Sequence, residues 1–590
     1  MNTKIASLLA GFWALGLANI APPATATEID ANPAHYRKLL TTLKPGDTMN
    51  LAPGKYSRLT IVGLNGTPTA WITIKGPASG APAIVFAESG YNTVEIINSS
   101  YVAIENLRID SRHFGDAFGI SAKGGNGNRT HDIRIEGNVL VGQDGDQQTV
   151  GISTKTPTWG WIIRNNQILE AGTGIYLGNS DGTQPFVNGL IENNLIKDTI
   201  GYNMEIKDQI SIPDIPGMPT EPTSTIIRNN VFIKDDRPTP EGNRPNLLVG
   251  AFPRLGTGSE NLYEIYGNFF FHNHREALFQ GSGRISLHDN IFVDGPPDYP
   301  AVVLMRHNFP LRVAYVYNNT VYTSERGIYF ETPALDTDAV VGNLVFASNP
   351  ISGAILHSAD NLTAPFANAR TYVNSPSFEL GAMDFYPRAG KCQGKAIDLR
   401  PFQKNADFGR DFNGTSKTQA KGAVVFRGAY AGDGANPGWQ LQAAVKPSSG
   451  SSPQPLAQGW LNRIPDGTET HFNSFLPIET QGLDNFESGN STGTWDSAIL
   501  ASCRSDEQNC HWDCGYSRST DSHATGLLLR QPAARAQQSP AQRCHRPPLA
   551  RAGGSAMAFP CRGPADIGRF AALQVGLRSR DYQLGQQLQP

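Results

Sequence analysis

The sequence has few charges and no excess of one sign, and both shortages exclude classes of protein. Charged residues make up 17% of the 590 positions, against roughly 25% in an average soluble protein. Lys and Arg number 49 against 52 Asp and Glu, so the basic excess that nucleic-acid binding requires is missing. The 61 Gly and 41 Pro disfavour a helical bundle or a coiled coil. A turn-rich, strand-rich protein is the class that remains.

Cysteine is nearly absent from most of the chain. Cys392 is the only cysteine before residue 503, and the other five lie in the last part of the sequence: Cys503, Cys510, Cys514, Cys544 and Cys561. The main body is therefore expected to fold without disulfides, and no Cys/His spacing in it is typical of a zinc site.

Long apolar runs are also missing after the first residues. The chain begins with a short positive segment ending at Lys4, continues with an apolar stretch over 5–20, and then has the small residues Ala24 and Ala26 around Thr25. This order is typical of a secretory signal peptide. We therefore expect residues 1–26 to be a signal peptide, the protein to be secreted or periplasmic, and no membrane span to follow.

A repeat fills the main body. Nine strand-like segments each carry one Asn between alternating apolar residues, 22 to 38 positions apart: Asn106, Asn138, Asn166, Asn194, Asn230, Asn268, Asn290, Asn319 and Asn343. An Asn inside a strand is costly unless it turns the chain or bonds to a copy of itself, and stacked coils allow both. The pattern therefore predicts a right-handed parallel β-helix, an all-β solenoid in which each coil buries its neighbours.

A second strand lies between the Asn segments, and its outward positions hold the candidate catalytic and binding residues. In copies such as GISTK (151–155) and NMEIK (203–207), the second and fourth residues should point inward and the third and fifth outward. The expected fifth positions are Lys123, Lys155, Gly178, Lys207, Gly250, Gln280, Arg306 and Glu331. The expected third positions include Ser121, Ser153, Tyr176, Glu205 and Leu278. Both columns should form ladders on one exterior face.

Both ends of the chain give further signals. Residues 33–40 have the spacing of a short amphipathic helix that would cap the open end of the stack. The β-helix is expected over 27–445, with a Pro/Ser/Gly linker over 446–480 and a poorly defined region over 481–590. Residues 496–590 contain 11 Arg and no Lys, so we interpret this tail as the product of a reading-frame shift near residue 495. A disordered tail is the alternative.

The chain resembles a known class of proteins. The segments LKPGDT (43–48), LAPGKY (51–56) and DFNG (411–414), with the Asn-bearing coils, are similar to secreted right-handed β-helix proteins related to polysaccharide lyases, of the alginate lyase and chondroitinase B type. The resemblance covers about residues 28 to 445. It implies an acidic polysaccharide substrate, cleavage by β-elimination, a lysine base, an arginine acid and bound calcium.

The resemblance also implies site residues. Lys207 matches the catalytic base and Arg254 or Arg306 the acid, while the outward columns themselves make Tyr176 a further candidate proton donor. Substrate binding would fall to four residues of the same face: Lys123, Lys155, Gln280 and His307. Glu205, Asp208 and Asn203 offer the hard oxygen ligands that calcium prefers.

Two other functions stay open at this point. A glycoside hydrolase would need two carboxylates across a sugar, for which Asp110 with Asp116, or Asp144 with Asp146, are candidates. A non-catalytic carbohydrate-binding protein would keep the same face without needing a base. In each case we expect a monomer that binds an acidic polysaccharide, and neither nucleic acid nor membrane.

Overall fold

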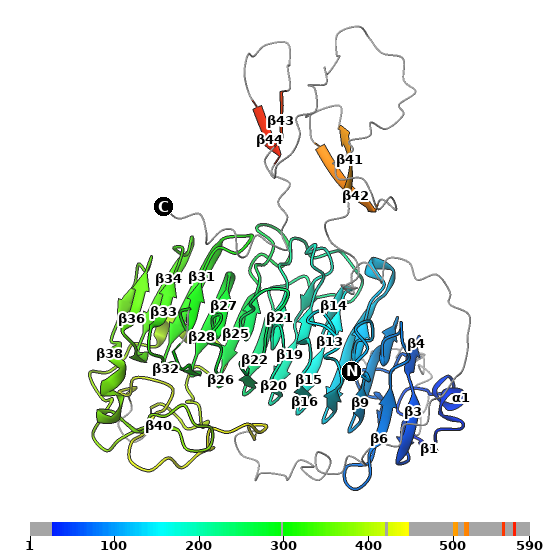
Figure 1. Cartoon of the computed structure of the whole chain (residues 1–590), viewed down its shortest axis with the longest axis horizontal. Coiled ribbons are helices and arrows are strands. Elements are labelled where there is room, and N and C mark those ends of the chain that lie inside the picture. The colour runs from blue at the N-terminus through cyan, green and yellow to red at the C-terminus, as the bar shows by residue number, and fades with distance from the viewer. Residues whose placement is uncertain are drawn as a thin grey trace, which may run out of the picture.

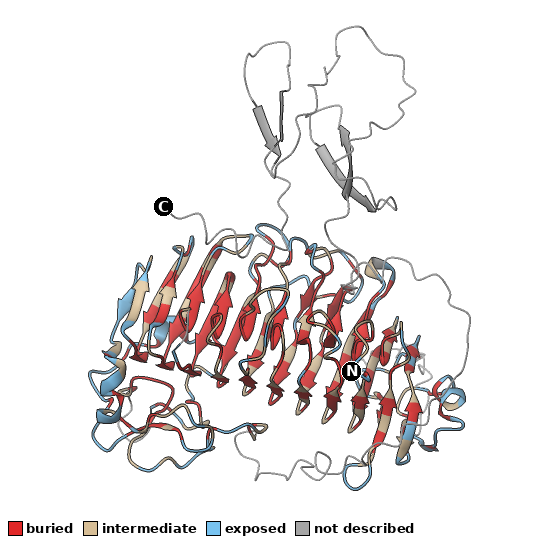
Figure 2. Ribbon diagram, viewed as in Figure 1, coloured by how far each residue is buried: buried red, intermediate tan, exposed pale blue. Residues whose placement is uncertain are grey.

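Three long parallel sheets form the body of the protein, which is a right-handed parallel β-helix (Figure 1). The computed structural model describes residues 26–296, 299–418 and 423–447, together with four strands further along the chain. Each coil contributes one strand to each sheet, so residues one coil apart are paired in register. Buried residues run along the strands through the whole stack (Figure 2).

We name the sheets A, B and C after the order in which a coil visits them. Sheet A pairs β1 (Glu28–Ala31), β2 (Thr48–Leu51), β5 (Ile72–Lys75), β8 (Ser100–Glu105), β11 (Thr130–Glu136), β15 (Ile162–Arg164), β19 (Leu190–Glu192), β22 (Ser224–Arg228), β25 (Leu262–Tyr266), β28 (Gly283–His288), β31 (Leu311–Tyr317), β34 (Thr337–Val341) and β37 (Ser358–Ala359), with β14 (Thr158–Trp159) and β18 (Phe186–Val187) at its side.

Sheet B pairs β3 (Gly54–Ser57), β6 (Ala83–Phe86), β9 (Arg108–Asp110), β12 (Val139–Val141), β16 (Gln167–Leu169), β20 (Leu195–Lys197), β23 (Val231–Ile233), β26 (Phe269–Phe271), β29 (Ile291–Val293), β32 (Thr320–Tyr322), β35 (Leu344–Phe346) and β38 (Leu362–Ala364). Sheet C pairs β4 (Leu59–Val62), β7 (Val94–Ile97), β10 (Ile120–Ala122), β13 (Val150–Thr154), β17 (Thr173–Leu177), β21 (Met204–Ile206), β24 (Leu247–Val249), β27 (Phe279–Gly281), β30 (Val302–Leu304), β33 (Arg326–Phe330) and β36 (Asn349–Gly353).

Short elements complete the chain. They are α1 (Tyr36–Leu40), η1 (Gly125–Gly127), η2 (Phe366–Thr371), η3 (Arg400–Phe402), and the antiparallel pairs β39 (Val373–Ser375) with β40 (Asp384–Pro387), β41 (Ile499–Ser505) with β42 (Trp512–Arg518), and β43 (Met557–Pro560) with β44 (Phe570–Leu573). The expected N-terminal helix is present but shorter than 33–40, and it buries Tyr36 and Leu40.

The predicted Asn ladder is confirmed. Along nine coils, the Nδ2 of each Asn donates to the Oδ1 of the next at 2.9–3.1 Å, through Asn138, Asn166, Asn194, Asn230, Asn268, Asn290, Asn319, Asn343 and Asn361. Asn106 is not a member, because Leu107 holds the ladder position on its coil and donates its N–H to Asn138. Asn106 lies one residue earlier, at φ 55°.

The C-terminal part of the body folds back over two of the three sheets. Phe385, Phe412 and Tyr430 join a buried cluster with outward residues of sheet B. Phe402 packs against sheet A and stacks on Tyr317 at 4.1 Å. In the described part of the chain, neither cluster includes a residue of sheet C.

The folded body extends to residue 447. Lys446, expected to open the linker, is buried, and its ammonium donates to Asn229, Gly267 and Phe412 at 2.7–2.9 Å. The predicted signal peptide lies outside the described residues, as do the linker beyond 447 and most of the tail. Among the described residues, no helix has the length and hydrophobicity that a membrane crossing requires.

Candidate functional site

The outer face of sheet C presents two columns of side chains, largely as the sequence predicts. Strand pairing aligns Ser121, Ser153, Tyr176, Glu205 and Leu248 in one column. By the same register, Lys123, Lys155, Gly178, Lys207 and Gly250 follow the strands as the second column.

The predicted register is wrong on the next two coils. Gln280 pairs with Leu248 and therefore belongs to the first column, not the second. Its carboxamide donates a hydrogen bond to the buried Glu276 carboxylate at 2.8 Å. Val303 pairs with Gln280, so Met305 takes the place expected for Arg306. Arg306 is exposed beyond the strand end.

Aromatic rings lie beside the lysines of the second column. The Nζ of Lys123 lies 4.9 Å from the centre of the Phe118 ring, and the Nζ of Lys155 lies 5.6 Å from the same ring. Tyr176 then lies between Lys155 and Lys207, at 5.2 and 5.5 Å from their ammonium nitrogens. We call these five residues the lysine row. Cation–π attraction holds the charges over the rings and keeps the cations in line along the face.

Glu205 is the acidic member of the face beside the lysine row. Its carboxylate is almost fully buried and accepts a hydrogen bond from Lys207 at 2.9 Å, while the Lys207 side chain keeps 22% of its surface exposed. Burial is the largest single influence on the pKa of Lys207 and lowers it, but Glu205, Tyr176 and Tyr202 together outweigh burial and raise that pKa well above the ordinary lysine value. Lys207 is therefore an ammonium ion at neutral pH.

Two glycines flank Lys207 in its column. A Cβ on Gly250 would lie 2.7 Å from the carbonyl carbon of Lys207 and 2.4 Å from the nitrogen of Asp208. A Cβ on Gly178 would lie 3.5 Å from the Cβ of Lys207. No side chain of the second column therefore lies beside Lys207 on either adjacent coil.

A second polar group adjoins Lys207 directly along the chain. The Asp208 carboxylate accepts from the Ala251 N–H at 2.8 Å and from Asn308 at 2.7 Å, and it lies 3.8 Å from the Nδ1 of His307. Burial raises the pKa of Asp208, but the hydrogen bonds from His307, Ala251 and Asn308 lower it further than burial raises it. The fold thus brings His307 beside Asp208 from three coils away.

Several polar atoms of this face have no hydrogen-bond partner among the described residues. They are the hydroxyls of Ser121, Ser153, Ser282 and Ser352 and the Oε1 of Gln280, all on outward positions of sheet C and all buried from bulk solvent. Buried polar atoms are normally hydrogen-bonded. Sheet C is therefore a face on which several outward polar atoms are not satisfied by the described protein.

The three expected calcium ligands have three different sets of partners. Glu205 accepts from Lys207, and Asp208 accepts from Ala251 and Asn308. Asn203 is fully buried, and its Nδ2 donates to Thr199 and to the carbonyl of Ile233. Calcium is held by several oxygens converging on one point, and these contacts do not make the three residues such a set.

The remaining candidates lie apart from the lysine row. Arg254 is exposed and makes no hydrogen bond or ion pair with described residues, and the same holds for Arg306. The carboxylates considered for hydrolysis serve local structure: Asp146 accepts from the backbone of Gln148 and Thr149, and Asp144 pairs with His113 at 2.5 Å.

Sequence reasoning missed Phe118, which separates the first two lysines. The signal was available, because Phe118 directly precedes the Gly119 that opens the outward strand. Its contribution depends on the ring reaching across to the next coil, and strand periodicity does not predict that.

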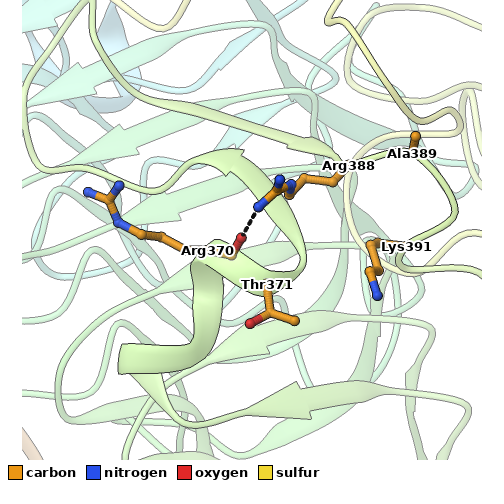
Figure 3. Close-up of a pocket in the computed structure, with 5 residues that line it drawn as sticks. All are labelled: Arg370, Thr371, Arg388, Ala389 and Lys391. Carbon is orange, nitrogen blue, oxygen red and sulfur yellow. Dashed lines mark hydrogen bonds between the residues drawn. The ribbon is translucent and has the colours of Figure 1, made fainter.

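A hollow elsewhere on the molecule is unrelated to this face. Figure 3 shows its lining residues, Arg370, Thr371, Arg388, Ala389 and Lys391, with Arg388 donating to the Arg370 carbonyl at 2.8 Å. All five are exposed and belong to the C-terminal segment around η2. We therefore place the candidate site on sheet C, where buried charges and unpartnered polar atoms converge.

Comparison with solved structures returns several proteins at low similarity. An alginate lyase from Paenibacillus sp. str. FPU-7 is 15% identical, over 58% of this chain and 99% of its own, with a TM-score of 0.32. Pectate lyase Pel9A is 10% identical, over 72% and 96%, with a TM-score of 0.34. A GH136 lacto-N-biosidase from Eubacterium ramulus is 8% identical, over 57% and 68%, with a TM-score of 0.33. No protein-family profile and no curated protein matches the sequence.

Proposed function

We propose that the protein binds an acidic polysaccharide along the outer face of sheet C and cleaves it by β-elimination. The lysine row is the observation that carries this proposal. It aligns three cations along the stack, one coil apart between Lys123 and Lys155 and two coils apart between Lys155 and Lys207. Coil spacing is about 4.8 Å, so the row suits a polymer whose residues each carry a carboxylate.

The lysine row supplies the groups that β-elimination from a uronic acid needs. Lys123 and Lys155 would neutralise sugar carboxylates, which acidifies the proton on C5. Lys207, when unprotonated, would take that proton as the C4–O bond breaks and a C4–C5 double bond forms. Tyr176, between Lys155 and Lys207, would give its proton to the departing oxygen. We prefer Tyr176 to Arg254 or Arg306 as the acid, because both arginines lie off the lysine row.

Glu205 sets a condition on this mechanism. Because it favours the ammonium form of Lys207, only a small fraction of the protein holds a neutral base at neutral pH. The reaction should therefore accelerate as the pH rises into the alkaline range. The same observation favours a second candidate, a protein that binds an acidic polysaccharide through a permanent Lys207 cation and does not cleave it.

One experiment separates the two candidates. The purified chain is incubated between pH 7 and pH 10 with alginate, pectate and chondroitin sulfate, while the ultraviolet absorbance of the unsaturated product and the retention of each polymer are measured. Elimination predicts an absorbance increase that grows with pH. Retention of polymer without absorbance supports the binding protein, and new reducing ends without absorbance support hydrolysis. If the protein neither retains a polymer nor forms product, sheet C is excluded as the site.

Two further expectations stay predictions. Calcium dependence is tested by repeating the assay with a chelator and then restoring calcium, with Glu205 as the ligand that adjoins the lysine row. Export is tested by sequencing the N-terminus of protein recovered from the periplasm or medium. Cleavage after Ala26 is the expected result.

A further inference from the structure

Two histidines and two aspartates from three consecutive coils meet at the edge of sheet B, outside the site described above. Strands β23, β26 and β29 pair so that Ile233, Phe271 and Val293 are in register. Asp236 follows the first strand, His272 and His274 follow the second, and Asp294 follows the third. The register of the stack therefore brings these side chains together from sequence positions almost 60 residues apart.

One carboxylate oxygen receives both imidazoles. The Oδ1 of Asp236 lies 2.7 Å from the Nε2 of His272 and 2.6 Å from the Nδ1 of His274. Among the described residues, these three form the one group of His, Cys, Asp or Glu side chains whose ligand atoms all lie within 4.8 Å of one another. The two histidines are a quarter to a third exposed, so solvent reaches the group.

The turn that carries the histidines has a fixed conformation. Asn273 is buried between them, and its Nδ2 donates to the Arg244 carbonyl at 2.9 Å while its N–H donates to Asp294 at 3.1 Å. His272 has a left-handed backbone with φ 60°, a conformation that residues other than Gly rarely adopt. This anchoring turns both imidazoles toward Asp236.

A buried carboxylate, that of Asp294, lies on the other side of His272 from Asp236 and is a second observation at this site. The Asp294 side chain is only 1% exposed, and its Oδ1 lies 3.6 Å from the Nδ1 of His272. Its Oδ2 has no hydrogen-bond partner among the described residues. Each ring nitrogen of His272 therefore faces a carboxylate, one at the surface and one buried.

We propose that Asp236, His272 and His274 bind a divalent transition-metal ion of the zinc class, with Asp294 orienting His272. Two imidazole nitrogens with one carboxylate oxygen are a typical zinc ligand set, and three protein ligands leave a position for water. Calcium is a poor fit because it prefers oxygen ligands. A carboxylate that accepts from the far nitrogen of a metal-bound histidine fixes its orientation, and Asp294 is placed for that role.

The metal would tie one long loop to the stack. Asp236 begins the segment 236–246, whose far part contacts the chain three coils earlier: Glu241 accepts from Gln148 at 2.6 Å and the Gly242 carbonyl accepts from Gln147 at 2.8 Å. Without metal, the Asp236 side chain at the start of this segment is held by its contacts with the two histidines. A bound ion would anchor the start of this segment, which connects β23 of sheet B with β24 of sheet C. The inference does not depend on the proposed function.

Zinc titration of the full-length, chelator-treated protein tests the proposal. Competition with a chromophoric chelator gives the affinity, and thermal unfolding with and without zinc gives an independent measurement, because a ligand of the native state raises its stability. We compare wild type with His272→Ala, His274→Ala, Asp236→Asn and Asp294→Asn. His113→Ala is the matched control, since His113 also pairs with a surface Asp.

We expect the wild type to bind one zinc ion that both histidine variants and Asp236→Asn lose, and that His113→Ala retains. Asp294→Asn should weaken binding roughly 10–100-fold, the usual effect of removing a partner behind a ligand. The tail cysteines are the same in every variant, so any zinc they hold cancels in the comparison. Cobalt bound at this site should show d–d absorption without a thiolate charge-transfer band.

Equal zinc binding in wild type and Asp236→Asn would overturn the proposal. Asp236 is 71% exposed, so this variant is not expected to disturb folding. Calcium competing as well as zinc, or a melting temperature that zinc does not change, would likewise reduce the group to a hydrogen-bonded cluster.

Discussion

Sheets A and C belong to the same coils, but charged side chains are arranged differently on their outer faces. On sheet A, one column reads Asp30, Asn50, Lys75, Glu105, Glu136, Arg164, Glu192 and Arg228. Neighbouring coils there offset one another, as in the Arg164–Glu136 and Arg228–Glu192 pairs at 2.8 and 2.7 Å. On sheet C, between Lys123 and Lys207, Glu205 is the one acid in the two outward columns.

Under the proposed function, this difference distinguishes a structural face from a binding face. In a column of alternating charges, the side chains of neighbouring coils pair with one another, so few charges are left to bind a ligand. On sheet C, three lysines face one acid between Lys123 and Lys207, so this part of the face has a net positive charge that suits an anionic polymer. The C-terminal segment strengthens the contrast, since it packs on sheets B and A, and its described apolar clusters do not include sheet C.

The prediction with the largest effect tests sheet C at its centre. Lys207→Ala should lower the rate of unsaturated product formation by at least roughly 100-fold, the usual contribution of a general base. Arg164→Ala, a cation of similar exposure on sheet A, should leave that rate unchanged. Equal loss in both variants, with circular dichroism intact, would mean that the faces do not differ in function.

A second prediction concerns the framework that both faces share. Asn230→Leu removes the acceptor for Asn194 and the donor to Asn268 and to the Ile191 carbonyl. We expect a loss of about 1–3 kcal/mol in the free energy of unfolding, because buried partners are left unsatisfied. Asn349→Leu, at an exposed position, should change the urea midpoint little. An unaltered midpoint for Asn230→Leu would contradict the ladder.

A third prediction uses the one acid beside the lysine row. Glu205→Gln removes a carboxylate that raises the pKa of Lys207, so that pKa should fall in the variant. If Lys207 is the base, the rise of activity with pH should shift to lower pH in this variant. Because the folded pKa is raised, the stability from this pair is complete below the ordinary lysine pKa and lost as pH rises through the folded value. A pH profile that does not move would exclude Lys207 as the base.

How far these features could be foreseen depends on what the alternation of side chains can encode. The Asn repeat is unambiguous, because one polar residue per coil fixes the register of the strands beside it. The register failed at Gln280 and Arg306, where Leu278 and Phe279, and then the run from Val302 to Met305, are apolar on successive positions. Because no polar residue marks the outer face there, the alternation of side chains does not show which positions point outward.

The site itself was foreseeable in composition but not in its interactions. Lys207 and Glu205 are two positions apart in a strand, so a shared face follows from the sequence alone. That their contact at 2.9 Å raises the pKa of the lysine, when a base needs it lowered, depends on their burial. The approach of His307 to Asp208 across three coils depends on loop paths, which carry no periodic signal.

A fourth prediction concerns affinity rather than turnover. Lys155→Ala removes the cation between Phe118 and Tyr176 and should weaken binding of the acidic polymer roughly tenfold, as expected for one charged contact. Added salt should weaken the wild type more than the variant, since screening acts on the charge that the variant has lost. Gel retardation in the polymer at two salt concentrations measures both. Undiminished retention would place the polymer elsewhere.

The smallest effect is expected on sheet A. Arg134→Ala breaks a pair with Glu105 at 2.7 Å, but the side chains are 25% and 19% exposed, and partly exposed ion pairs contribute about 0–1 kcal/mol. Glu105→Gln should have an equally small effect, and the double variant should cost no more than either single change if the pair is their shared contribution. Chemical denaturation of the four proteins measures this coupling, and polymer binding should stay constant across them. A loss of binding in Arg134→Ala would show that sheet A also serves the ligand, and the division between a self-satisfied face and a binding face would then fail.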